Sequence, residues 1–166
     1  MTTRPATAAD VPAVLPMVSK VAALHEQWDP AKYGYRPNPA EMYRDWLGKR
    51  ASDPRSVFLV AERADAMLKE VPFLTGFLVG TVEKEIGIYR LAEYGFIHDV
   101  WVEPEYRNEG LGRQMVTLAI ERFRDIGVKQ VRLDTAAPNA VARNLFASCG
   151  FRPSTQEMLL EIQSNE

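Results

Sequence analysis

The sequence predicts a mixed α/β fold, a sheet with helices on its faces, and three observations indicate it. Two amphipathic helical stretches come early in the chain, apolar strand-like runs fill its middle, and the second half alternates between strand and helix. The chain has 166 residues, of which 46% are hydrophobic. This length suffices for one domain with a sizeable core, and we predict a single domain over residues 1–166.

Caps and helical spacing mark the two early helices. Asp10 is a candidate cap for the first helix, and Pro16 lies deep enough that we expect a bend or a later start. Asn38-Pro39-Ala40-Glu41 resembles a capping box with proline at the first helical position, and it predicts a second short helix through Leu47. The apolar stripe of the first helix comprises Val11, Val14, Leu15, Val18 and Ala22.

Apolar runs predict the strands. Three of them cover residues 57–61, 73–82 and 96–102, with residues 63–70 and 85–93 as connections. Two more cover residues 131–135 and, at the end of the chain, 158–162.

Two further helices are expected in the second half. The first has its apolar residues at helical spacing and should end at Gly127. The second opens at Pro138-Asn139 and closes at Gly150. The stripe of the first comprises Leu111, Met115, Leu118, Ala119 and Ile126, and that of the second Ala142, Leu145, Phe146 and Cys149.

Composition argues against several functions. The formal net charge of −2 gives no basic field to hold nucleic acid. No stretch approaches the roughly 20 apolar residues of a membrane span, and residues 1–5 lack the apolar run of a secretory signal. The single cysteine, Cys149, rules out an internal disulfide and fits a reducing compartment. We therefore expect a cytoplasmic protein without a nucleic-acid or membrane partner.

The stretch from Val100 to Arg113 is the most informative about function. An apolar strand runs into a short polar turn, and a helix opens at an Arg107-x-x-Gly110-x-Gly112 step. Free N–H groups at a helix N-terminus suit a phosphate or pyrophosphate, and the two glycines let the backbone approach it closely. A plain loop with glycine at a helix start is the alternative.

A second motif follows, Asn139-x-x-Ala142-x-x-Leu145-Phe146-x-x-x-Gly150-Phe151. Together the two motifs resemble those of the GCN5-related N-acetyltransferase superfamily, and in order they are far more specific than a lone Gly-x-Gly. The resemblance covers roughly the second half of the chain. It implies a mixed, mostly antiparallel central sheet flanked by helices, acetyl-CoA (coenzyme A) as cofactor, and an amine acceptor as partner.

The resemblance also implies which residues hold coenzyme A. The pyrophosphate would lie on the turn, and the pantetheine arm along the strand before it. Arg107 either touches phosphate with its side chain or contributes only backbone, and Asn139 contacts the cofactor, caps the last helix, or does both. The assigned residues are Val100, Trp101, Val102, Arg107, Asn108, Glu109, Gly110, Leu111, Gly112, Arg113, Asn139 and Phe146, with no metal ligand.

His98 is the candidate catalytic base, because the resemblance places bases or acceptor-pocket residues at His98 or Phe96 and a histidine titrates near neutrality. A structural histidine on a half-buried strand is the alternative. Asp99 matches an acidic residue frequent in the family, but alternation predicts that it faces away from His98, which favours a structural role. The expected faces are Phe96, His98, Val100 and Val102 on one side, and Ile97, Asp99 and Trp101 on the other.

Phe146 departs from the family pattern, which often has a tyrosine there to protonate the departing thiolate. Phenylalanine has no proton to give, so water or another group supplies it or the thiolate leaves unassisted. Core packing is the preferred role of Phe146. Cys149, on the same apolar stripe, is interpreted as an inert core residue, and direct transfer in a ternary complex is expected.

The resemblance places the acceptor pocket partly on the loop between the first two helices, where this chain has Trp28, Tyr33 and Tyr35. Aromatic rings can pack on an apolar substrate or over an ammonium group, and anchoring of the loop is the alternative. We therefore predict an acetyl-CoA-dependent N-acetyltransferase for a primary amine, with a homodimer as in many relatives. A non-catalytic acyl-CoA-binding module and a nucleotide or phosphosugar binder are the alternatives.

Overall fold

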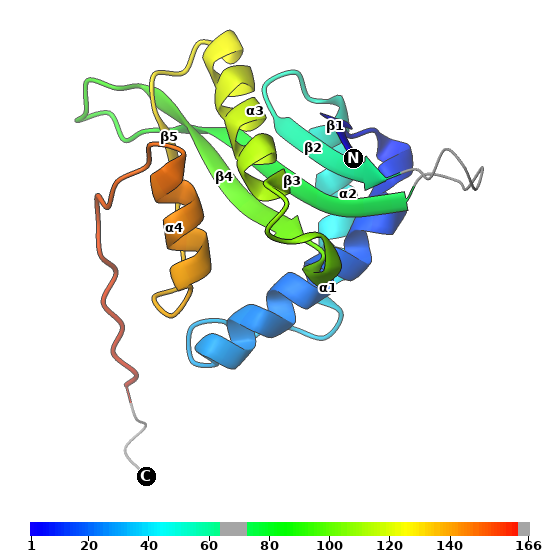
Figure 1. Ribbon diagram of the computed structural model, residues 1–166. Coiled ribbons are helices and arrows are strands. Elements are labelled where there is room, and N and C mark those ends of the chain that lie inside the picture. Colours follow the sequence, from blue (N-terminus) through cyan, green and yellow to red (C-terminus); the bar gives the residue numbers. More distant parts are fainter. Residues whose placement is uncertain (64–72, 163–166) are drawn as a thin grey trace.

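The computed structural model in Figure 1 describes residues 1–63 and 73–162. A five-stranded sheet forms its centre, and helices cover both faces of the sheet. In chain order the helices and strands are β1 (Thr2–Pro5), α1 (Val11–Trp28), α2 (Pro39–Ser52), β2 (Val57–Arg63), β3 (Phe73–Lys84), β4 (Glu93–Val102), α3 (Leu111–Ile126), β5 (Val131–Leu133) and α4 (Ala140–Ser148). Two 3₁₀ turns, η1 (Ala8–Asp10) and η2 (Pro104–Tyr106), accompany them.

The sheet has the order β1-β2-β3-β4-β5. The first three pairs of neighbours are antiparallel, and β5 pairs parallel with β4. This confirms the expected mixed, mostly antiparallel sheet. The β4–β5 pairing covers only Gly95 to Ile97, so the two strands pair at one end of β4 alone.

Two apolar cores lie on opposite faces of the sheet. Helices α1 and α2 pack on one face, against residues such as Phe77 and Val79 of β3. Helices α3 and α4 pack on the other, against Leu78 of the same strand. The predicted stripe of the first helix is buried throughout, which confirms that its spacing faces a core: Val11, Val14, Leu15, Val18 and Ala22.

A register shift interrupts β4. Val79 of β3 lies opposite Asp99, and the next residue, Gly80, lies opposite Ile97, so His98 is an extra residue in the ladder. Ile97 packs in the α3–α4 core, whereas Trp101 packs in the α1–α2 core. The predicted alternation is therefore wrong between residues 97 and 99, because a bulge breaks the period of two.

The structure corrects both predicted caps of the early helices and excludes a later start of the first one. Helix α1 runs through Pro16 from Val11, so its start is not delayed. The Asp10 carboxylate accepts hydrogen bonds from Arg4 (2.8 and 2.9 Å) and from the Thr7 N–H (2.7 Å), and it does not cap α1 in the described chain. Helix α2 starts at Pro39 as predicted, but its capping box is absent from the described residues because the Glu41 carboxylate binds Arg44 at 2.9 Å.

The strands differ from the prediction at both ends of the chain. Strand β1 was not expected, because its four residues show no apolar alternation. The strand expected at residues 158–162 is wrong, since residues 151–162 are neither helical nor paired. Most of the expected connection at residues 63–70 lies outside the described residues, and β4 already begins at Glu93. No helix in the described ranges is long and apolar enough to cross a membrane.

Phe123 of α3 lies in a groove made by two glycines. A Cβ atom added at Gly95 would lie 2.7 to 2.9 Å from its ring atoms, and one at Gly80 would lie 2.9 Å from Cζ. The Phe123 side chain is fully buried, so its ring has little room to move.

We expect Gly95→Ala to lower the free energy of unfolding by about 1–3 kcal/mol, because the added methyl overpacks the Phe123 ring. Gly87→Ala is the matched control, since a Cβ there would meet no atom of the described chain within 4 Å. Urea titration of both variants measures the difference. Equal stability of the two variants would contradict the tight contact.

Candidate active site

The turn between β4 and α3 is built on two left-handed residues. Asn108 has φ 66° and Gly110, directly before α3, has φ 82°. No side-chain hydrogen bond caps α3 within the described chain, and a Cβ at Gly110 would meet nothing within 4 Å there. The first N–H groups of α3 therefore keep their hydrogen-bonding capacity for an anion from outside.

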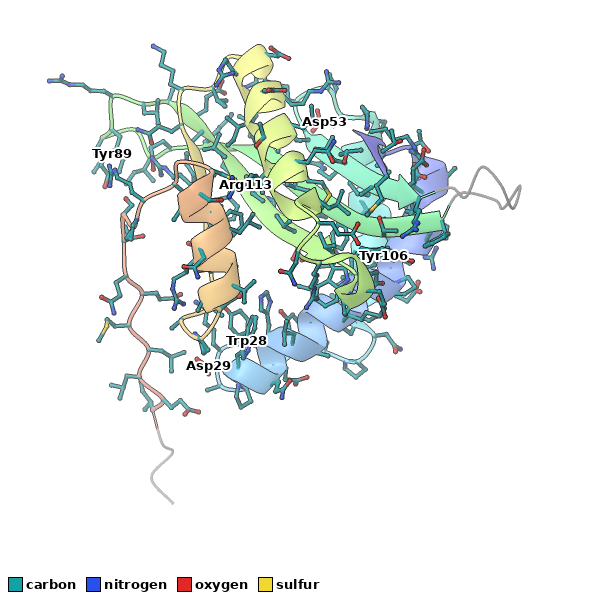
Figure 2. The ribbon with its side chains drawn as sticks, viewed as in Figure 1. Trp28, Asp29, Asp53, Tyr89, Tyr106 and Arg113 are labelled. Carbon is teal, nitrogen blue, oxygen red and sulfur yellow. The ribbon has the colours of Figure 1, made fainter. Side chains whose placement is uncertain are left out.

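Gly112 brings the two predicted motifs together. A Cβ atom at this position would lie 3.3 Å from Leu145 Cδ2 of α4 and 3.9 Å from Val102 Cγ2 of β4. The first turn of α3 thus packs directly on α4 and on the end of β4. Figure 2 shows Arg113 in the first turn of α3, beside α4.

Arg107 folds back onto the end of β4. Its Nε donates to the Val102 carbonyl at 2.9 Å, and its guanidinium lies 4.7 Å from the centre of the Trp101 ring. The Trp101 side chain itself is buried in the α1–α2 core, so only its backbone reaches the edge of the strand. Glu105 and Glu109 are exposed.

The edge of β4 that faces β5 is open beyond Ile97. Pairing with β5 stops there, and among the described residues no other strand follows along His98 to Val102. Apart from the Val102 carbonyl, which accepts a hydrogen bond from Arg107, the backbone groups that point to this side are therefore available to an extended ligand. This is the position implied for the pantetheine arm.

Helix α4 confirms two of the local predictions. Asn139 caps it, since its side-chain oxygen accepts a hydrogen bond from the Ala142 N–H at 3.1 Å. Phe146 is only 8% exposed and packs edge-on against Phe151, with 5.7 Å between ring centres. Core packing is thus its structural role, and Cys149 lies on the same apolar surface. Contact of Asn139 or Phe146 with a cofactor stays a prediction.

His98 is held by a short chain of hydrogen bonds. Its Nε2 lies 2.7 Å from Thr81 Oγ1, and the Thr81 hydroxyl donates to the Glu83 carboxylate at 2.5 Å. Because that hydroxyl has only one proton, its oxygen accepts from a protonated Nε2, which leaves Nδ1 with the free lone pair. The ring is further held edge-on by Trp46 and Phe96, with ring centres 5.2 and 5.0 Å away.

Burial lowers the pKa of His98 below its usual 6.5, while the nearby Glu83 charge raises it in part. The imidazole is therefore neutral at neutral pH. A neutral imidazole with one free nitrogen can accept a proton, which a general base must do.

Asp99 lies on the same side of the sheet as His98, against α2. Burial raises its pKa from 3.8 to about 6, and a hydrogen bond from Tyr43 partly offsets this rise. Its Oδ2 is closed to solvent and has no hydrogen-bond partner in the described ranges. Burial and the Asp99 charge also raise the pKa of both Tyr35 and Tyr43. The expectation that Asp99 faces away from His98 is corrected by the bulge.

The predicted acceptor loop is organised around His25. Its ring stacks on Tyr33 (4.8 Å between centres), lies 5.5 Å from Trp28, and its Nδ1 is 3.5 Å from the Tyr35 hydroxyl. Figure 2 shows Trp28 at the end of α1, where this loop begins. These contacts link the loop to the end of α1. A role of the three aromatic residues in acceptor binding stays a prediction.

The loop also approaches the end of β5. Burial raises the pKa of Tyr33, and the charge of Asp134, one residue beyond β5, adds to the rise. The residues that sequence reasoning did not assign to the site are Thr81, Glu83, Tyr43 and Trp46. They come from β3 and α2, and no motif in the sequence links them to His98.

A cavity of about 490 Å³ lies elsewhere. It is bounded by residues 53–59 and by the last turns of α3. None of the predicted site residues lines it, and Figure 2 shows Asp53 on that side of the molecule.

Asp99 makes stability depend on pH. Between about pH 4 and 6 the folded chain keeps the Asp99 proton while the unfolded chain loses it, so stability falls as pH rises through this window. Asp99→Asn removes this titration. We expect the unfolding free energy of the variant, relative to the natural chain, to rise by about 2–3 kcal/mol between pH 4 and 7. Chemical denaturation at both pH values measures it, and a constant difference would contradict the raised pKa.

The model of the acetyltransferase (GNAT) family matches residues 21–151. A mycothiol acetyltransferase of Cellulomonas flavigena is 28% identical over 76% of this chain and 36% of that protein. The Arabidopsis thaliana N-alpha-acetyltransferase MAK3 is 32% identical over 48% of this chain, and the Escherichia coli (K12) bS18-alanine N-acetyltransferase 34% over 36%. The matches span 42% and 40% of those two proteins, so this chain covers less than half of these curated relatives.

Solved structures share the fold. A mutant of the BH1408 protein from Bacillus halodurans superimposes with a TM-score of 0.82 at 19% identity, over 98% of this chain and all of that chain. The aminoglycoside N-acetyltransferase AAC(6')-Iy in complex with CoA has a TM-score of 0.67 at 13% identity, over 98% and 95% of the two chains. With the family model matching most of its length, this chain belongs to the acetyltransferase (GNAT) family.

Proposed function

We propose that this chain transfers the acetyl group of acetyl-CoA directly to a primary amine of a small molecule or a protein. The observation that carries the proposal is the meeting of the two motifs at Gly112, beside the open edge of β4. Membership of the family supports acetyl transfer. Relatives whose names specify N-acetylation, of a ribosomal protein alanine and of aminoglycosides, support an amine acceptor.

The cofactor site would use backbone more than side chains. The uncapped first turn of α3, with Arg107 to Arg113 before and within it, offers N–H groups to the pyrophosphate. Val100, Trp101 and Val102 offer the open strand edge to the pantetheine arm, with Asn139 and Phe146 on the α4 side. When bound, acetyl-CoA supplies the thioester, and a β4 N–H polarises its carbonyl.

His98 would take the proton from the attacking amine through its free Nδ1, directly or through a water. Its Nε2–H, Thr81 and Glu83 form a chain that stabilises the charge developing on the ring. This chain compensates in part for burial, which alone would make His98 a weaker base. The thiolate leaves without a proton from Phe146, as its low pKa of about 8.5 permits near neutral pH.

The acceptor would bind as a cation on the other side of β4. An ammonium group bound near Asp99 would offset the cost of burying an ionised carboxylate. The Asp99 charge raises the pKa of both Tyr35 and Tyr43, and aromatic rings are suited to bind an ammonium group. Trp28 and Tyr33 hold the loop after α1 through their contacts with His25.

The remaining expectations complete the proposal. We infer a homodimer located in the cytoplasm. The charge of Asp99 and the neighbouring aromatic residues favour an acceptor that carries a cationic group.

The direct test is release of free CoA from acetyl-CoA with a panel of polyamines, aminoglycosides, amino acids and short peptides. Amine-dependent release of CoA is the expected result. Acetyl-CoA binding without release for any amine would favour a non-catalytic acyl-CoA-binding module. Thermal stabilisation by ATP or NAD equal to that by CoA would contradict the cofactor assignment.

Removal of the base should affect turnover and not cofactor affinity. We expect His98→Ala to lower kcat by about 10²–10⁴-fold while the Kd of acetyl-CoA stays within about twofold. Stopped-flow kinetics and calorimetry measure the two quantities. Unchanged kcat at all pH values would remove His98 as the base.

The Glu83 charge should influence the acid limb of the pH–rate profile through the pKa of His98. Because this charge raises the pKa of His98, Glu83→Gln should shift the acid limb of kcat/KM to lower pH. Glu121→Gln, an exposed charge change on α3, is the matched control and should leave the limb in place. A limb that stays fixed in Glu83→Gln would show that a different group controls it.

A further inference from the structure

The turn after β4 begins with a charged residue that is largely closed to solvent. Glu103 directly follows β4, and its side chain is only 14% exposed. Both of its carboxylate oxygens accept hydrogen bonds from Lys20 Nζ, each at 2.8 Å. Lys20 lies in the middle of α1, far from Glu103 in the sequence, and Figure 1 shows the end of β4 next to this helix. The ion pair therefore joins α1 to the start of the turn.

Backbone hydrogen bonds already fix the position of Glu103. Its N–H donates to the Thr75 carbonyl of β3 at 2.8 Å, and its carbonyl accepts from the Tyr106 N–H of η2 at 2.9 Å. The Tyr106 ring in turn lies 6.0 Å from the ring of Phe73, measured between their centres. Because these contacts hold the path of the chain, the main contribution of Lys20 at this position is its charge.

That charge matters because the other end of the same turn is the proposed anion site. The uncapped N–H groups at the start of α3 would hold the phosphates of the cofactor. A carboxylate in the same turn repels those phosphates, and water and salt screen it poorly where it is little exposed. Glu105 and Glu109 are exposed, so solvent screens their charges better. Glu103 lacks this screening and has the Lys20 ammonium instead.

We propose that Lys20 is a positioning residue of the cofactor site, which acts by cancelling the charge of Glu103 so that the turn accepts the phosphates of acetyl-CoA. The inference rests on the proposed function, and it adds a residue of α1 to a site otherwise built from β4, α3 and α4. An ion pair that only stabilises the fold is the alternative. The two differ in what they predict when both partners are made neutral together.

The experiment is calorimetric titration of CoA into the whole chain and its variants. Lys20→Met removes the ammonium and keeps an apolar stem, so Glu103 is left unpaired. We expect the Kd of CoA to rise about 10-fold in this variant. In the double variant Lys20→Met/Glu103→Gln neither charge remains, and we expect the Kd to return to within about twofold of the natural value. Lys20→Arg keeps the charge and should bind CoA as the natural chain does.

Arg44→Met is the matched control. Arg44 also forms an ion pair, with Glu41 at 2.9 Å, but this pair lies on α2 and is exposed. The substitution changes the net charge of the chain by the same amount as Lys20→Met, and it should leave the Kd of CoA within about twofold. Glu103→Gln alone is a second variant, independent of Lys20→Met, and it should bind CoA at least as tightly as the natural chain.

Several results would overturn the proposal. Natural CoA affinity in Lys20→Met would show that the ammonium is not needed. A double variant that binds as weakly as Lys20→Met would assign the loss to the missing ion pair as a structural contact, and weaker binding by Glu103→Gln alone would do the same. If the natural chain binds CoA, these failures concern Lys20 alone. A natural chain that binds no CoA would overturn the proposed cofactor site, and this inference with it.

Discussion

The extra residue in β4 is the constraint on which the proposed site depends. At the register shift beside Val79 and Gly80, His98 and Asp99 both turn toward α2. A regular strand would place one of them in the α3–α4 core, where an ionisable group would have to be buried among apolar side chains. The bulge thus puts two ionisable groups on the α1–α2 side of the sheet and leaves Ile97, Val100 and Val102 on the other.

The same position in β4 separates the two parts of the site. Before the bulge, β4 pairs with β5 and the sheet is continuous. Beyond it, the edge of β4 is open and leads directly to the uncapped start of α3, which suits an extended, phosphate-bearing ligand. The residues of α2 lie on the face of the sheet opposite α3, together with His98 and Asp99. An acyl donor and a cationic acceptor can therefore approach one strand from different directions.

The features of the fold that depend on a local sequence pattern could be predicted from the sequence. The buried stripe of α1, the glycine that ends α3 and the Asn139 cap all follow from residue spacing or from single turn residues. The spacing in α3 predicted the buried Leu111, Met115 and Ala119, but not the buried Val116 and Phe123. The features that depend on pairing between segments far apart in the sequence could not be predicted. The bulge has no signature within β4, since it is defined by the register against β3. For the same reason the Thr81–Glu83 contacts of His98 were missed. Residues 158–162 have the pattern of a strand, but pairing also requires a neighbour.

The most direct measurement of the central claim is an NMR titration of the ¹⁵N-labelled chain with CoA. We expect the largest amide shifts on Val100, Val102 and residues 110–113, on both sides of the turn. We expect only small shifts around the separate cavity bounded by residues 53–59. Shifts that concentrate at that cavity, or that are absent from the β4 edge and the first turn of α3, would contradict it.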